Sequence, residues 1–205
     1  MSLLWSNTVR ETPLRSVGPS AMFEAEIKYS TAGPVVPPGE YLGSAEYADV
    51  YFDRPDGSFY AAGRELRLRR TGGRTLLTGK LPPFDQASQS KEEWETSVDD
   101  GAVMAEILQN LGFVRRVAFT KQCRLFRDVS QGLALTITVV NVDFSPETFV
   151  EIEHPAADRE AGLAALPVIR DYAARLGLAT ECPTCYTELC RSARTGTTPK
   201  GASPP

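Results

Sequence analysis

The chain has 205 residues, 42% of them hydrophobic and 23% charged, which suits one globular domain with or without tails rather than two full domains. Its net charge of −4 gives no overall field that would attract DNA or anionic lipid, so any phosphate site has to be local. No apolar run approaches the roughly 18 residues of a membrane span, and Met1 to Ser6 is too short and too lightly charged for a secretory signal. We therefore expect a cytoplasmic protein that binds neither DNA nor membrane.

The two ends of the chain differ in composition from the middle. Residues 1–20 scatter Pro, Gly, Ser and Arg without periodicity, and the last residues are mostly Thr, Gly, Pro, Ser and Lys. We expect a disordered or vector-derived segment at 1–20, one domain at 21–190 and a disordered tail at 191–205. Four cysteines are too few for a disulfide framework in a chain of this size.

Short segments of alternating polarity, separated by turn residues, fill most of the middle. This pattern is typical of an antiparallel sheet or barrel. Gly72 and Gly73 predict a two-residue hairpin turn rather than a phosphate loop, because a type I′ turn needs positive φ at both central positions. The pattern predicts eight strands, near Ala21–Ser30, Ser44–Asp53, Arg64–Thr71, Arg74–Leu81, Lys91–Val98, Phe113–Arg127, Gly132–Val142 and Thr148–His154.

Two helices are expected between these strands. Asp99 or Asp100 can cap a helix that ends near Asn110. A second helix is predicted over Asp158–Leu176, with a break or kink at Pro167. The apolar stripe of the first helix consists of Val103, Ile107, Leu108 and Leu111.

The charged residues of several strands share one phase. Glu24, Glu26 and Lys28 alternate with apolar residues and therefore lie on one strand face. Glu151 and Glu153 do the same in a later strand. Arg67 and Arg69 place two positive charges side by side, Lys80 ends the next strand, and Glu93 and Glu95 alternate in the one after it.

Like charges on one strand face repel, so such a face is either solvated or neutralised by ions of opposite sign. An ordinary solvated sheet face would explain the charged residues of any single strand. The recurrence of like-charge pairs on several strands weakens that interpretation. Two acidic pairs could hold a hard divalent cation while Arg and Lys on neighbouring strands bind the phosphates that the metal also touches. In a closed eight-stranded barrel these faces would line a polar tunnel.

At these residues the sequence resembles the CYTH superfamily of triphosphate tunnel metalloenzymes, and within it most closely the class IV adenylyl cyclases. F-E-A-E-I-K matches the family's E-x-E-x-K signature, and F-V-E-I-E resembles its closing acidic strand. The resemblance covers Ala21 to Cys190, and the matching segments occur in the order expected for the family. The other matching segments are D-V-Y-F-D, G-R-E-L-R-L-R, L-T-G-K-L-P, L-G-F and C-Y-T-E-L.

The resemblance implies an α+β, mainly β fold, a closed eight-stranded antiparallel barrel that forms a triphosphate tunnel and carries a few flanking helices. It implies that one or two Mg²⁺ or Mn²⁺ ions are held by carboxylates, and that basic side chains bind the triphosphate. The implied metal ligands are Glu24, Glu26, Glu151 and Glu153, which with Lys28 form the implied catalytic set. The implied substrate-binding residues are Lys28, Arg67, Arg69, Lys80, Lys121 and Arg124.

The sequence departs from the family pattern at two places. Lys121 is followed in phase by Cys123, and Arg124 would point outward unless a bulge shifts it. The family's Asp before the closing acidic strand corresponds to Asn141 or, after a register shift, to Asp143. The number of metal ligands therefore stays open.

The single histidine and three of the four cysteines are expected to have structural rather than catalytic roles. His154 has the opposite phase to the glutamates, which favours a strand-end or surface role over catalysis. Cys182, Cys185 and Cys190 could suggest zinc, but a structural zinc site needs a fourth ligand, so incidental packing is the favoured interpretation.

Three functions fit the resemblance. The favoured one is a class IV-type adenylyl cyclase, which converts ATP to cyclic AMP and pyrophosphate. The second is a hydrolase of inorganic triphosphate, thiamine triphosphate or a nucleoside triphosphate, and the third is a barrel that binds a triphosphate without catalysis. The fold alone does not choose among them, and the sequence also leaves open whether the protein is a homodimer.

Overall fold

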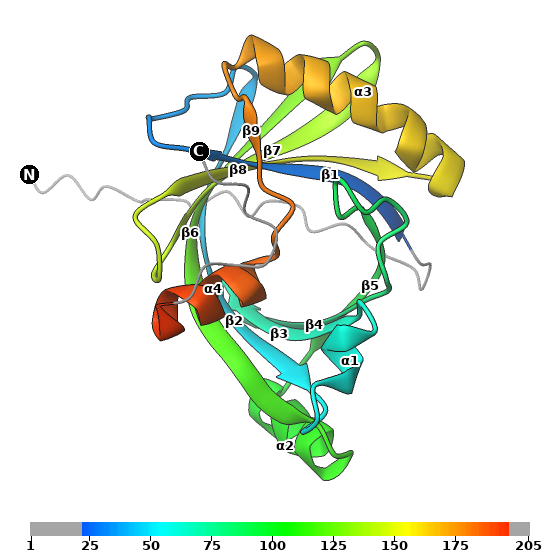
Figure 1. Ribbon diagram of the computed structural model, residues 1–205, viewed down its shortest axis with the longest axis vertical. Helices are drawn as coiled ribbons and strands as arrows, with labels where there is room; N and C mark the ends of the chain where they lie inside the picture. Colours follow the sequence, from blue (N-terminus) through cyan, green and yellow to red (C-terminus); the bar gives the residue numbers. More distant parts are fainter. Residues whose placement is uncertain (1–21, 197–205) are drawn as a thin grey trace, which may run out of the picture.

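The structure is a computed structural model that describes residues 22–196 (Figure 1). The segment expected to be disordered at 1–20 lies outside these residues, as do residues 197–205 of the expected tail. Among the described residues, no helix is both long and apolar enough to cross a membrane.

Nine strands and four helices make up the described chain. The strands are β1 (Met22–Thr31), β2 (Glu40–Asp53), β3 (Glu65–Thr71), β4 (Arg74–Lys80), β5 (Lys91–Val98), β6 (Val114–Ser130), β7 (Leu133–Val142), β8 (Thr148–Ala156) and β9 (Thr180–Glu181). The helices are α1 (Ser58–Ala61), α2 (Gly101–Asn110), α3 (Arg159–Arg175) and α4 (Tyr186–Thr195).

The first eight strands form a closed antiparallel barrel, which confirms the fold class expected from the sequence. Their order is β5-β4-β3-β2-β6-β7-β8-β1, and pairing of β1 with β5 joins the two ends of this series. The short β9 pairs with the end of β1 that β5 does not reach, at Tyr29 and Ser30. Closure leaves the strands with an inner and an outer face, so alternate residues point into the barrel.

Local sequence explains the turn between β3 and β4. Gly72 and Gly73 have φ values of 52° and 76°, the left-handed conformation that glycine adopts without steric cost. The predicted Gly-Gly hairpin is confirmed, and it sets the register in which Arg67 opposes Thr78 and Glu65 opposes Lys80.

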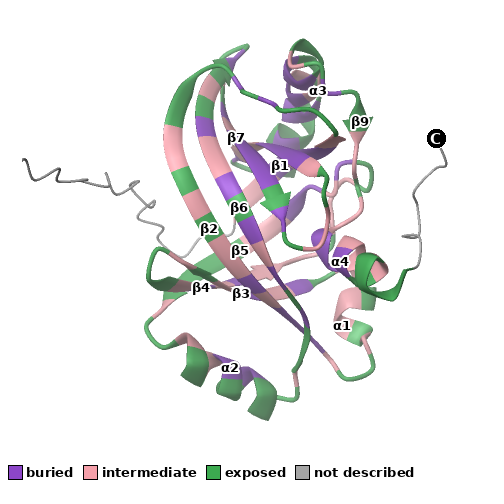
Figure 2. Cartoon of the chain, turned by 90° about the vertical axis from the view of Figure 1, so that its left-hand side faces the viewer, coloured by how far each residue is buried: buried purple, intermediate pink, exposed green. Residues whose placement is uncertain are grey.

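The largest apolar core lies outside the barrel, between α3 and the outer faces of β1, β7 and β8 (Figures 1 and 2). Ile27, Ile137 and Ile152 come from the strands and Ile169 from the helix, and all are almost fully buried. The helix continues without a break through Pro167, which is exposed, so its ring faces away from this core.

The helix α2 covers a smaller core on the outer faces of β2 and β3. The carboxylate of Asp100 caps it by accepting hydrogen bonds from the backbone N–H groups of Ala102 and Val103, as predicted. The predicted apolar stripe is only partly correct, because Leu108 is buried while Val103, Ile107 and Leu111 are exposed. The helix packs through Leu108 and Ala105 instead.

A third apolar cluster fills one end of the barrel interior and contacts α4. Phe119 and Phe149 project inward from β6 and β8, and the ring of Tyr186 from α4 packs 5.3 Å from that of Phe149. Cys123 and Cys190 are buried in the same cluster. The helix α4 therefore closes part of this barrel end, and the polar residues occupy the remainder of the interior (Figure 1).

Several element boundaries differ from those predicted. The strand β2 begins at Glu40 rather than Ser44, because Gly43 (φ 126°) lies at a register shift that interrupts the alternation. The sequence did not predict α1, β9 or α4. Residues 191–195 are helical, so the expected disordered tail was placed too early in the chain.

Candidate active site

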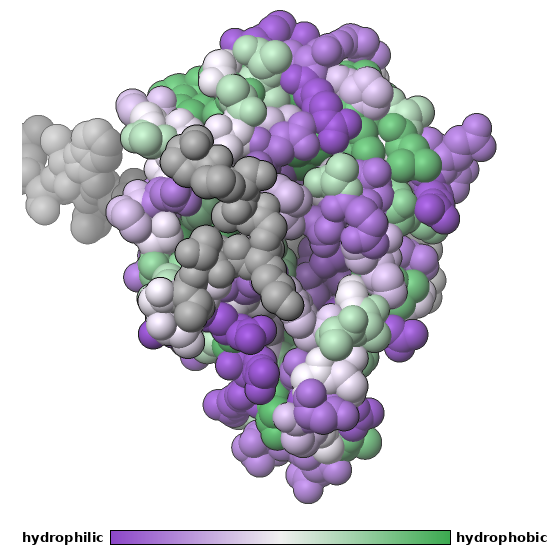
Figure 3. All heavy atoms as spheres, viewed as in Figure 1, coloured by the Kyte–Doolittle hydropathy of each residue, from purple (hydrophilic) through white to green (hydrophobic). Residues whose placement is uncertain are grey.

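The barrel encloses a cavity of about 730 Å³ whose wall is made by charged side chains of both signs. Figure 3 shows hydrophilic residues around a hollow on the face viewed in Figure 1. Apart from Arg124, every site residue predicted from the sequence lines this cavity. The strand phase analysis thus located the cavity wall correctly.

The acidic part of the wall comes from two adjacent strands. Glu24 and Glu26 project from β1, and Glu151 and Glu153 project from β8. In the antiparallel register Glu26 lies directly opposite Glu153, and Lys28 opposite Glu151. Carboxylate oxygens of Glu26, Glu151 and Glu153 lie within 4.8 Å of one another.

This crowding changes the acidity of the carboxyl groups. Burial raises the pKa of Glu24 and of Glu26, and neighbouring glutamates raise both further. Burial together with the charges of Glu26 and Glu151 raises the pKa of Glu153 to about 8. Fully ionised, the cluster would carry more negative charge than its surroundings neutralise, so these three carboxyl groups hold their protons more tightly than an ordinary glutamate does.

Glu151 differs from the other three because it has a cationic partner. Its burial alone would raise its pKa, but the ammonium of Lys121, 3.1 Å away, and that of Lys28 bring the value down to about 2. Glu151 is therefore the member of the cluster that stays ionised without any added cation.

The donor set of Glu26, Glu151 and Glu153 fits a hard divalent cation. All three offer carboxylate oxygen, with neither thiolate nor imidazole in the group. A bound cation would offset the mutual repulsion that raises the pKa of Glu26 and Glu153 and would favour their ionised forms. These three residues could hold Mg²⁺ or Mn²⁺, and Glu24 lines the cavity beside them.

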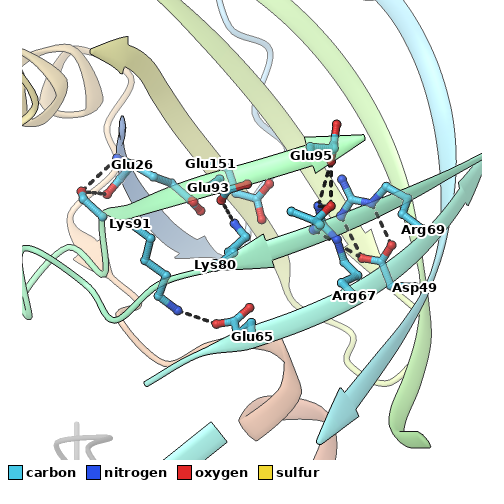
Figure 4. Close-up of polar contacts among 12 residues, drawn as sticks. Glu26, Asp49, Glu65, Arg67, Arg69, Lys80, Lys91, Glu93, Glu95 and Glu151 are labelled. Carbon is cyan, nitrogen blue, oxygen red and sulfur yellow. Dashed lines mark hydrogen bonds and ion pairs between the residues drawn. The ribbon is translucent and has the colours of Figure 1, made fainter. Parts of the chain in front are cut away.

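The basic part of the wall comes from β3 and β4, with Lys91 from β5 beside them (Figure 4). Arg69 donates two hydrogen bonds, of 2.7 and 2.8 Å, to the carboxylate of Asp49. Lys80 pairs with Glu93, and Lys91 pairs with Glu65. These ion pairs hold the cationic groups in fixed positions on the wall.

Arg67 is the most enclosed of the arginines on the wall. It donates a hydrogen bond to Thr78 and lies 3.5 Å from the carboxylate of Glu95. Its Nε is buried and, within the described residues, has no hydrogen-bond partner. A buried N–H without an acceptor is costly, so this atom is a ready donor for an anionic ligand.

Lys28 and Lys121 meet at the end of the cavity where α4 lies. Their ammonium groups lie 4.1 and 3.7 Å from the ring centroid of Tyr186. The backbone carbonyl of Thr184 also accepts a hydrogen bond from Lys28. The start of α4 and the residues before it therefore complete this end of the wall.

Arg124 does not belong to the site. The pairing of β6 with β7 runs without a register shift, so no bulge turns this side chain inward. Arg124 instead donates a hydrogen bond to the carbonyl of Val35 on the outside of the barrel. Its expected role in binding the substrate is contradicted by this position.

Neither candidate for the family's additional aspartate reaches the cavity. Asn141 is exposed and donates a hydrogen bond to the hydroxyl of Thr148. The exposed Asp143 accepts a hydrogen bond from the backbone N–H of Thr120. His154 contacts the carbonyl of Ala134 and also lies outside the cavity, consistent with the structural role expected for it.

The prediction missed several wall residues. The charged residues Glu65, Lys91, Glu93 and Glu95 line the cavity but were not assigned to the site. The alternation of Glu93 and Glu95 was recognised in the sequence, and the same period of two could have added Glu65 and Lys91. Asp49, the carboxylate that accepts the hydrogen bonds of Arg69, is in phase with Tyr51, which lines the cavity from β2. The sequence offered no such signal for Tyr186, because it reaches the cavity from a helix.

The closed eight-stranded barrel with a cavity wall of mixed charge defines the class of fold, and comparison with known proteins gives the family. Residues 22–182 match the model of the CYTH domain, so the chain belongs to the CYTH family.

One curated relative and two solved structures illustrate the similarity. The chain is 35% identical over 65 residues to the "Putative adenylate cyclase MJ0240" of Methanocaldococcus jannaschii, a match that covers 32% of this chain and 37% of that protein. The PH1819 protein of Pyrococcus horikoshii OT3 has a TM-score of 0.74 and 25% identity, over 82% of this chain and 98% of that one. The Hippeastrum protein HpAC1, described as a "putative adenylyl cyclase" with a dominant triphosphatase activity, has a TM-score of 0.59 and 18% identity, over 87% and 98% of the two chains.

Proposed function

We propose that this protein is a metal-dependent enzyme that binds a linear triphosphate inside the barrel and acts as a class IV-type adenylyl cyclase. The observation that carries the proposal is the arrangement of charges in one cavity. The oxygen cluster of Glu26, Glu151 and Glu153 lies on one wall, and the cations of β3 and β4 lie on the wall that faces it.

The cationic residues would bind and orient the phosphates. Arg67 has a buried donor free for a phosphate oxygen, and Arg69 is held in place by two bonds to Asp49. Lys80 and Lys28 extend the positive charge toward the glutamates. Charge-assisted hydrogen bonds of this kind are short and strong, and they would fix the chain of phosphates along the tunnel.

Glu26, Glu151 and Glu153 would hold Mg²⁺ or Mn²⁺, with Glu24 as a fourth carboxylate beside them. When bound, such an ion neutralises charge that develops on the reacting phosphate. The barrel wall would shield the phosphates from bulk water, which strengthens every charge interaction inside it. In the cyclase reaction the ribose 3′-oxygen forms a bond to the α-phosphorus while the bond to the pyrophosphate breaks.

The name of the Methanocaldococcus relative supports the cyclase assignment, although the match spans little more than a third of that protein. A triphosphatase is the second candidate, because the structurally similar Hippeastrum protein is described as having a dominant triphosphatase activity. That likeness, at 18% identity, shows the fold alone. A triphosphatase would use the same residues, with water attacking the γ-phosphorus.

The test is to incubate the full chain with ATP, thiamine triphosphate or inorganic triphosphate, each with Mg²⁺ or Mn²⁺, and to separate the products. Cyclic AMP with pyrophosphate would support the cyclase, and orthophosphate would support the triphosphatase instead. Binding without any product would overturn the enzymatic proposal and leave a triphosphate-binding barrel.

A matched pair of variants connects the reaction to the cavity. Glu93→Gln alters a carboxylate on the cavity wall, whereas Glu92→Gln alters its neighbour in the opposite phase of β5. We expect the first to change turnover and the second to leave it unaltered.

A further inference from the structure

The segment between β9 and α4 contains two cysteines separated by two residues, Cys182-Pro183-Thr184-Cys185. Both side chains reach the wall of the cavity and are only partly buried. The other two cysteines, Cys123 and Cys190, are 2% and 0% exposed in the apolar cluster beside α4. The chain therefore has one accessible pair and one inaccessible pair of thiols.

The accessible pair surrounds Lys28, a residue of the proposed triphosphate site. The backbone N–H of Cys182 donates a 2.7 Å hydrogen bond to the carbonyl of Lys28, and the ammonium of Lys28 donates to the carbonyl of Thr184. The thiol of Cys182 lies 3.9 Å from that same carbonyl. The peptide between the two cysteines thus helps to position the Lys28 side chain.

Cys185 directly precedes α4 and has contacts of its own. Its sulfur lies 2.6 Å from the hydroxyl of Tyr60 and 3.0 Å from that of Thr187. The ring of Tyr186, the next residue, contacts the ammonium groups of both Lys28 and Lys121. The contacts of the Cys185 sulfur therefore lie one residue away from the ring that contacts both lysines.

We propose that Cys182 and Cys185 form a reversible disulfide that weakens binding of a triphosphate by displacing Thr184 and Tyr186 from Lys28. The Cys-x-x-Cys spacing is the one in which neighbouring thiols of a protein commonly form a disulfide. The bond would take the sulfur of Cys185 away from Tyr60 and Thr187 and tighten the peptide that carries the Thr184 carbonyl. The effect on binding rests on the proposed function, whereas the disulfide itself does not.

The oxidant we propose is a small-molecule disulfide such as oxidised glutathione. A thiolate of the pair attacks one sulfur of the oxidant, whose S–S bond breaks and releases one glutathione thiol. The second cysteine then attacks the mixed disulfide and releases the other. The protein loses two protons and two electrons, and the oxidant takes them up to become two thiols.

The experiment treats the full chain with oxidised glutathione and compares it with protein kept in dithiothreitol. Peptide masses should reveal a Cys182–Cys185 link that is two hydrogens lighter than the reduced peptide and is reversed by dithiothreitol. Hydrogen exchange, measured without ligand, should rise over residues 182–190 in the oxidised protein. Inorganic triphosphate, titrated by calorimetry, should bind about tenfold more weakly after oxidation, the effect of losing roughly one charge-assisted hydrogen bond.

Two variants provide the comparison. In Cys182→Ser the ratio of oxidised to reduced affinity should return to unity, whereas Cys123→Ala should keep the wild-type ratio. Glutathione attached to one cysteine without a Cys182–Cys185 link would overturn the proposal. A complete link with unaltered hydrogen exchange would overturn the displacement of α4. Reduced protein that binds no triphosphate would instead contradict the proposed function, while peptide masses and hydrogen exchange would still decide on the disulfide and the displacement.

Discussion

The ammonium of Lys121 lies 3.1 Å from the carboxylate of Glu151, although β6 and β8 are separated by β7 in the sheet. Both side chains are at most 10% exposed, so the pair spans the interior of the barrel rather than its surface. It connects the acidic wall to the end of the cavity where Tyr186 lies. A buried charge is costly without its partner, so this pair couples barrel stability to the geometry of the site.

Removing the cation of this pair should therefore destabilise the fold. We expect Lys121→Met to lower the free energy of unfolding at pH 7 by about 3 kcal/mol, because Glu151 remains buried without its closest cationic partner. Urea unfolding followed by circular dichroism measures the change. The double variant Lys121→Met/Glu151→Gln should recover part of the loss, and a double variant less stable than the single one would contradict this explanation.

The same pair should contribute to stability in acid. The folded-state pKa of Glu151 is about 2 and its ordinary value is 4.5, so its contribution is present above pH 4.5 and is lost as the pH falls toward 2. Lys121→Met should therefore lose less stability than the wild type between pH 5 and pH 3. Parallel curves for the two proteins would show that Lys121 does not cause the low pKa of Glu151.

The proposed location of the triphosphate site can be tested by comparing an arginine inside the cavity with one on the outer surface. Arg67 is 7% exposed inside the cavity, whereas Arg115 is exposed on the outer surface. We expect Arg67→Ala to weaken the binding of inorganic triphosphate by about 10- to 100-fold, since it removes charge-assisted bonds to phosphate. Arg115→Ala should leave the affinity within about twofold, because exposed charges are screened by salt. Equal losses in a calorimetric titration would rule out the proposed location of the site.

Most of the acidic wall was predictable because a strand has a period of two. Glu24 and Glu26 share a face regardless of how the chain folds further on, and the same holds for Glu151 and Glu153. What the sequence did not contain is which strands become neighbours. The pairing of β1 with both β8 and β5 brings Glu93 and Lys91 to the site, and it depends on closure of the whole barrel.

The errors have specific physical causes. Arg124 was predicted on the wall only if a bulge shifted its phase, and β6 contains no shift against β7. α4 was missed because its apolar face packs into the end of a barrel that exists only in the folded protein. The apolar residues of α2 were assigned to one stripe, but the helix buries Ala105 and Leu108 and leaves Ile107 exposed.

The raised pKa of Glu153 gives a prediction with the opposite sign to that of Glu151. Its value is about 8 in the folded protein against 4.5 ordinarily, so its contribution to stability is present below pH 4.5 and is lost as the pH rises through 8. In EDTA, Glu153→Gln should be more stable than the wild type at pH 8 by about 1–3 kcal/mol and equally stable near pH 4.5. Urea unfolding at both values measures the difference. The exposed Glu147→Gln is the matched control, and an equal gain there would contradict the prediction.

Metal dependence is the prediction that separates the proposed site from a merely basic pocket. Glu24, Glu26, Glu151 and Glu153 all line the cavity that would receive the phosphates. Without a cation the ionised members of this group would repel the substrate, while Arg69, Lys80 and Lys91 are already paired with other acidic groups. We therefore expect EDTA to abolish turnover and Mg²⁺ or Mn²⁺ to restore it. Ca²⁺ should inhibit, because its coordination is larger and looser.

Binding of the ion can be measured without any turnover. Burial and mutual repulsion raise the pKa of Glu26 and Glu153, so binding of Mn²⁺ must release protons and should weaken as the pH falls from 8 to 5. Calorimetry in two buffers of different ionisation enthalpy would detect the released protons. Glu26→Gln should bind Mn²⁺ at least about tenfold more weakly, whereas Glu92→Gln, on the outer face of β5, should bind it as the wild type does. Turnover that persists in excess chelator, or Mn²⁺ affinity that Glu26→Gln leaves unchanged, would show that these glutamates do not hold a catalytic ion.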